Sequence, residues 1–116
     1  MIKIFMLLSI ISSQPINDTY WLCYQIGSLL NKNTMIISNI QADQYNDNYD
    51  IREKQFNQAI QKETNGKFNG QFDGQCISFT GAKKAMKYRT KNINRAKHNK
   101  YKIWNIEFNY NPKIKE

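Results

Sequence analysis

The most regular alternation of apolar and polar residues lies between positions 101 and 110. Trp104, Ile106 and Phe108 alternate there with polar side chains. Successive residues of a strand point to opposite faces of a sheet, so this pattern predicts a strand with one buried and one solvated face. Asn111 and Pro112 follow and end the strand, because proline cannot donate to a sheet ladder.

Three more segments predict strands. Residues 19–26 and 34–40 are rich in aromatic and branched side chains, and residues 76–79 form a shorter run of the same kind. The glycine, serine and asparagine residues within 27–33 can turn the chain. The first two strands are therefore expected to pair as a hairpin.

Two segments predict helices. Asp50 can cap a helix over residues 51–63, with Glu53 at the position of a capping box and Phe56 on the apolar stripe. Thr80 can cap a second helix that ends near His98. The apolar face of this second helix repeats at steps of three and four residues: Ala82, Ala85, Met86, Arg89, Ile93 and Ala96.

The resulting element order, β-β-α-β-α-β, predicts an α+β fold. We expect a two-layer sandwich, with a largely antiparallel four-stranded sheet and both helices on one face. The connection over residues 65–76 repeats Asn-Gly and Asp-Gly pairs, which favour turns. Phe68 and Phe72 are expected to hold this loop against the body of the domain.

The N-terminus resembles a short export signal. Lys3 supplies a positive charge, residues 4–11 are apolar, and Ser12 and Ser13 offer a cleavage site before Pro15. The apolar run is too short to span a membrane. We therefore predict a signal segment at 1–13 and one domain at 14–116, located in the periplasm or secreted. The alternatives are a buried first strand of a cytosolic protein and a misassigned start.

Two cysteines, Cys23 and Cys76, lie far apart in the sequence without neighbours at metal-binding spacing. In an exported protein they predict a disulfide; two buried free thiols are the alternative. The intervals between Asp43, Asp47 and Asp50 do not match a calcium loop. No metal and no cofactor are expected.

The net charge of +8 is unevenly distributed. Residues 77–116 hold eleven Lys and Arg against two Glu, a balance of +9, whereas residues 14–76 hold five against seven acids, a balance of −2. Such a surface attracts an acidic protein, a nucleic acid or another polyanion; a merely solvated helix face is the alternative. The predicted binding residues are the cations on and after the second helix, with Tyr88 and Tyr101 among them: Lys83, Lys84, Lys87, Arg89, Lys91, Arg95, Lys97 and Lys100.

The leading hypothesis is an exported, non-enzymatic binding module for an anionic macromolecule. A nuclease-like toxin is an alternative, in which His98 and Glu107 would act as general acid and base on a phosphodiester. We expect these two side chains to lie far apart, because the first ends a helix and the second lies on the solvated face of the last strand. A structural component of an exported complex is the third hypothesis, and the sequence leaves the oligomeric state open.

Overall fold

The computed structural model describes residues 19–42 and 49–112. The predicted signal segment, Asp43 and Asp47 lie outside the described residues. The described elements follow one another in this order: β1 (Thr19–Leu29), β2 (Lys32–Ser38), β3 (Gln41–Ala42), α2 (Tyr49–Glu63), β4 (Asn69–Gly70), β5 (Gln75–Thr80), α3 (Ala82–His98) and β6 (Lys102–Ile106).

Strand β1 is the centre of the sheet. It pairs antiparallel with β2 and β3 along one side, and with β5 and β4 along the other. Strand β6 pairs with β2 in parallel. The predicted hairpin of the first two strands is confirmed, and its turn is shorter than expected, at Leu30 and Asn31. The α+β class is also confirmed, although the described sheet has six strands, two of them very short, and one parallel pair.

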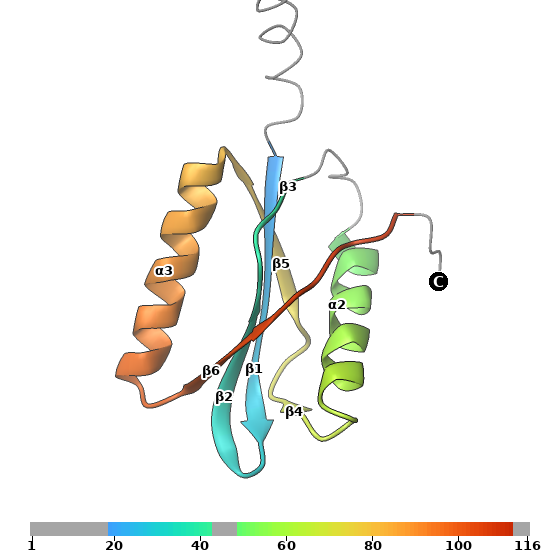
Figure 1. Cartoon of the computed structure of the whole chain (residues 1–116), viewed down its shortest axis with the longest axis vertical. Helices are drawn as coiled ribbons and strands as arrows, with labels where there is room; N and C mark the ends of the chain where they lie inside the picture. The colour runs from blue at the N-terminus through green and yellow to red at the C-terminus, as the bar shows by residue number, and fades with distance from the viewer. Residues whose placement is uncertain (1–18, 43–48, 113–116) are drawn as a thin grey trace, which may run out of the picture.

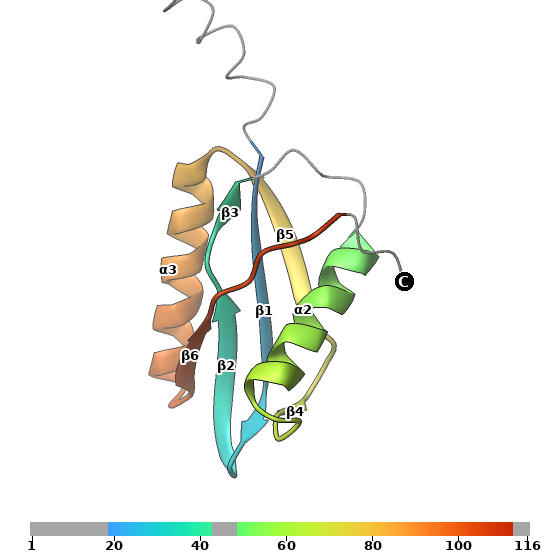
Figure 2. The ribbon, with the colours of Figure 1, turned by 45° about the vertical axis from the view of Figure 1, so that its right-hand side comes forward.

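The two helices lie on opposite faces of this sheet, so the prediction that both cover one face is wrong. Helix α2 packs on the face that carries Trp21, Cys23 and Ile36. Helix α3 packs on the face that carries Leu22 and Met35. The strands lie between the two helices in Figures 1 and 2. The domain therefore has three layers, because neighbouring residues of β1 and β2 are apolar on both faces.

A disulfide joins Cys23 and Cys76, as the sequence predicted. The two residues are direct partners in the β1–β5 register, with Cα atoms 4.1 Å apart. Both side chains are buried. The bond thus ties the central strand to the edge strand, and a disulfide of this kind persists in oxidising compartments.

Helix α2 is attached by polar contacts as well as by Phe56. The guanidinium of Arg52 is buried between the rings of Trp21 and Tyr110, 4.1 Å from each centroid. Glu53 accepts a hydrogen bond from the backbone N–H of Cys76 at 3.0 Å. The capping-box role predicted for Glu53 is therefore not the contact it makes; it pairs instead with the outward N–H of an edge strand.

Two further local expectations are corrected. Helix α3 begins after Gly81, which occupies the N-cap position with φ 95° and no side-chain hydrogen bond, so Thr80 is not the cap. In the preceding loop, Phe68 is buried as expected, but Phe72 is 70% exposed. The loop is held at β4 instead, where Gly27 of β1 approaches Gly70 closely.

Candidate anion-binding surface

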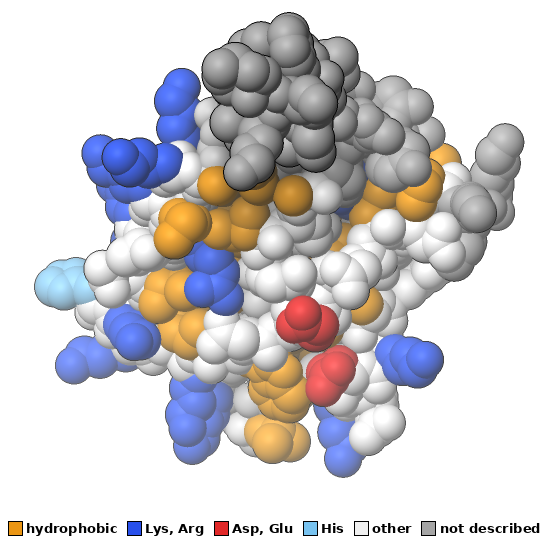
Figure 3. All heavy atoms as spheres, turned by 45° about the horizontal axis from the view of Figure 1, so that its top comes forward, with side chains coloured by type: hydrophobic (Ala, Val, Ile, Leu, Met, Phe, Trp, Pro, Cys, Tyr) orange, Lys and Arg blue, Asp and Glu red, His pale blue; other side chains and the backbone are white. Residues whose placement is uncertain are grey.

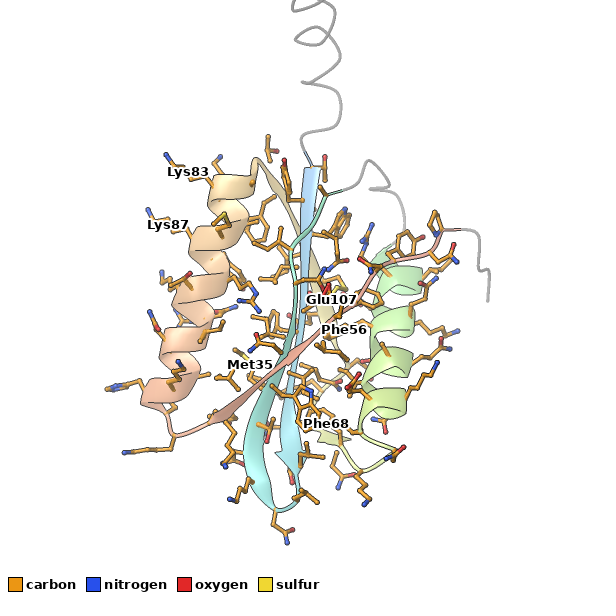
Figure 4. All side chains as sticks on the ribbon, viewed as in Figure 1. Met35, Phe56, Phe68, Lys83, Lys87 and Glu107 are labelled. Carbon is orange, nitrogen blue, oxygen red and sulfur yellow. A yellow bond between two sulfur atoms is a disulfide. The ribbon has the colours of Figure 1, made fainter. Side chains whose placement is uncertain are left out.

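The outer side of α3 carries a dense row of positive charge. Seven of its seventeen residues are Lys or Arg, and none is Asp or Glu. Lys83 and Lys87 point away from the sheet (Figure 4). In Figure 3, Lys and Arg side chains gather along the side formed by α3, whereas the visible acidic side chains lie nearer the middle. The predicted residues that are exposed are Lys83, Lys84, Lys87, Lys91, Arg95, Lys97 and Lys100.

Arg89 is the exception among the predicted binding residues. It is half-buried on the inner side of α3. Its Nε donates to the backbone oxygen of Ser38 at 2.9 Å, and its Nη2 donates to Oδ1 of Asn105 at 2.6 Å. Burial lowers the pKa of the Arg89 guanidinium. This side chain anchors α3 to the ends of β2 and β6, a role foreshadowed by its position on the apolar face of the predicted helix.

The N-terminus of α3 places two cations where they do not help the helix. Lys83 and Lys84 lie in the first turn, which contains no acidic residue and no side-chain cap. The helix dipole presents partial positive charge at this end, so cations there are unfavourable. These two lysines therefore do not stabilise the fold, and a bound anion would offset their unfavourable interaction with the helix dipole.

A cleft of about 230 Å³ opens between α3 and the sheet. Tyr24 comes from β1, Tyr88 from α3, and Tyr101 from the turn after α3. That turn forms because Lys100 adopts φ 69° and the N–H of Tyr101 bonds back to Ala96 at 2.9 Å. The complete lining is Tyr24, Ile26, Met35, Tyr88, Asn92, Arg95, Ala96, Asn99 and Tyr101. Met35 extends from β2 toward α3 in Figure 4.

Two polar side chains of this cleft, Tyr24 and Asn92, differ in whether they have a hydrogen-bond partner. The hydroxyl of Tyr24 bonds to Oε1 of Gln75 at 3.1 Å. Burial raises the pKa of Tyr24, the adjoining Tyr88 raises it further through charge and a hydrogen bond, and Arg95 lowers it. The amide nitrogen of Asn92 is buried and has no hydrogen-bond partner in the described part of the chain. The lining of the cleft therefore includes Asn92, whose buried amide nitrogen is unsatisfied, and the cation Arg95.

Sequence reasoning singled out Tyr88 and Tyr101 but missed Tyr24 and Asn92. Tyr24 belongs to the first predicted strand, and it lies on the face of the sheet that α3 covers. Asn92 is a polar, uncharged residue of the predicted second helix. The available signal was its spacing: position 92 is three residues before Arg95 and four after Tyr88, so these side chains share one side of a helix.

The structure does not bring His98 and Glu107 into one cleft. Glu107 lines a cleft of about 430 Å³ with Asn39, Arg89 and Asn105 among the other lining residues. His98 is exposed in the last turn of α3, nine residues after Arg89, which is about 14 Å along the helix axis. Both side chains are exposed.

A second group of exposed residues lies at the end of the β1–β2 hairpin. Leu30 is 71% exposed and adopts φ 53°, which is uncommon for leucine. Lys32 and Lys102 lie beside it, and the proximity of Lys32 lowers the pKa of Lys102. This end of the domain adds positive charge next to the C-terminal turn of α3.

Within residues 19–42 and 49–112, no cluster of three or more His, Cys, Asp or Glu side chains could hold a metal ion. None of the described helices is long and apolar enough to cross a membrane. No protein-family model, curated protein or solved structure matches this chain.

Proposed function

We propose that this protein is an exported, non-enzymatic binding module that recognises an anionic macromolecule through the exposed cations of α3. The observation that carries the proposal is the charge of this helix, which has seven Lys and Arg and no acid. Six of these cations are exposed. Their combined field would attract a polyanion and accelerate its association.

The position of the charges supports a binding role over simple solvation. Lys83 and Lys84 occupy a helix N-terminus that lacks a cap and an acidic residue. Cations in this position reduce helix stability by a few tenths of a kcal/mol to about 1 kcal/mol each. Their presence is accounted for when a partner supplies the missing negative charge.

The place of action is part of the proposal. A buried disulfide is typical of oxidising compartments, and together with the signal-like segment at 1–13 it supports a periplasmic or secreted protein. The nuclease alternative receives no support from the described residues, since His98 does not line the cleft that contains Glu107.

Charge reversal tests the proposal. The variant Lys84→Glu, Lys87→Glu, Lys91→Glu removes three exposed cations from the outer side of α3. We expect it to weaken binding to a polyanion such as heparin or DNA and to reduce the salt slope, log K against log salt, by about 2 to 3. The fold should be retained, because these side chains lie opposite the buried residues Ala85 and Ala96.

A matched control separates a specific surface from net charge. The variant Lys54→Glu, Lys62→Glu, Lys67→Glu makes the same change in charge at exposed positions on and after α2, across the sheet. It should retain most of the affinity. Equal losses in both triple variants, or none in either, would show that α3 is not the binding surface.

A further inference from the structure

We propose that the cleft formed by Tyr24, Tyr88, Tyr101 and Asn92 binds a base of single-stranded nucleic acid, whose phosphates lie along the adjoining cations of α3. This inference rests on the proposed function and names the ligand class. The observations that carry it are the aromatic lining of the cleft, its unused hydrogen-bond donor and the charged row at its edge.

The row of side chains beside the cleft combines charge with an aromatic ring. Lys84, Tyr88, Lys91 and Arg95 follow one another at steps of four, three and four residues. Residues at these steps share one side of a helix. Their span, from Lys84 to Arg95, is about 16 Å along the axis. A single strand along this row would place phosphates near the three cations and a base at Tyr88.

The interior of the cleft favours a flat ring with a polar edge. Its volume of about 230 Å³ is sufficient for one ring system. Bases stack on aromatic side chains in proteins that bind single strands. The buried amide nitrogen of Asn92 lacks an acceptor in the described part of the chain, and a base edge carries carbonyl and ring-nitrogen acceptors.

Other anionic polymers fit these contacts less well. A sugar ring bears many hydroxyl groups that each need a partner, whereas the hydroxyl of Tyr24 already donates a hydrogen bond to Gln75. A segment of Asp and Glu would use the cations but carries no flat ring to fill the cleft. Duplex DNA keeps its bases stacked inside, away from the cleft.

The test compares oligothymidylate with an abasic phosphodiester oligomer of the same length and charge, using fluorescence anisotropy on the purified chain. The wild type should bind oligothymidylate about 5-fold or more tightly than the abasic oligomer, since stacking adds to the affinity for each base. The variant Asn92→Leu removes the unused donor and should lower the affinity for oligothymidylate by about 3- to 10-fold. It should leave affinity for the abasic oligomer unchanged.

Two further arms make the result decisive. Asn92→Leu should not unfold the domain, because it deletes a buried donor that has no partner; a urea titration checks this. Asn94→Leu makes the same chemical change at an exposed position of α3 and should bind oligothymidylate as the wild type does.

Equal binding of both oligomers would overturn the base-binding cleft while leaving the proposed function intact. Binding to polyglutamate but to neither oligomer would overturn it in favour of an acidic protein partner. Binding to no polyanion would overturn both proposals.

Discussion

The disulfide should supply a large part of the stability of this domain. It closes a chain segment with a sequence separation of 53 residues between Cys23 and Cys76. In the chain-entropy model, a loop of this length lowers the stability of the unfolded state by about 4 kcal/mol. Domains of this size are stable by only about 5–15 kcal/mol, so losing the bond should remove a substantial fraction of the total.

The perturbation is the double variant Cys23→Ala, Cys76→Ala, compared with the wild type in the absence and presence of a reductant. Unfolding in urea is followed by circular dichroism. With a slope of about 2 kcal/mol per M, a loss of about 4 kcal/mol moves the midpoint down by about 2 M. The double variant should be at least as unstable as the reduced wild type, because both sulfur atoms are buried and their deletion leaves a cavity.

The comparison with reduced wild type separates the cross-link from the packing of the sulfur atoms. The cross-link predicts a difference between oxidised and reduced wild type, whereas packing alone predicts a difference only in the alanine variant. A reduced wild type that stays within about 1 kcal/mol of the oxidised protein would refute the reasoning from loop closure.

Three other predictions follow from single contacts. The double variant Lys83→Glu, Lys84→Glu should raise the stability of the domain by about 1 kcal/mol, because acidic side chains interact favourably with a helix N-terminus. It should also weaken polyanion binding. Lower stability in thermal unfolding would contradict the helix-dipole argument. Gly27→Ala should lower the free energy of unfolding in urea by about 2 kcal/mol or more, since the new Cβ would overlap Phe68 and the backbone of β4. The loss should exceed that of Gly66→Ala, a position with free space around it but with φ +74°. Burial raises the pKa of Tyr24 in the folded state above the 10.0 of an unfolded tyrosine. The resulting stabilisation of the folded state is fully present below pH 10.0 and is lost as the pH rises through the pKa of the folded state. Urea midpoints between about pH 9 and pH 11 should therefore fall more for the wild type than for Tyr24→Phe; parallel curves would contradict it.

The sequence predicted the local elements of this fold better than their arrangement. Alternation and apolar runs located β1, β2, β5 and β6, because each strand is specified by its own residues. The placement of α2 and α3 on opposite faces depends on which strands pair. Strand β6, which follows α3 in the chain, pairs in parallel with β2. The residues of β6 alone do not indicate which strand it pairs with.

The candidate site was predicted in the same uneven way. The cations of α3 were visible in the sequence because they are close together and on one helix. The cleft was not, because Tyr24 and Asn92 lie far apart in the chain and meet only after the sheet forms. Arg89 belongs both to the predicted apolar face and to the predicted charged group, and its hydrogen bonds to Ser38 and Asn105 favour the first role.

The central claim is that the outer side of α3 binds an anionic macromolecule. The most direct measurement is an NMR titration of the isotope-labelled chain with oligothymidylate, in which backbone amide shifts are followed residue by residue. We expect the largest shifts on α3, around Lys84, Lys87 and Lys91, and we expect them to weaken as salt is added. Shifts centred on α2, or no shifts with either oligothymidylate or polyglutamate, would contradict it.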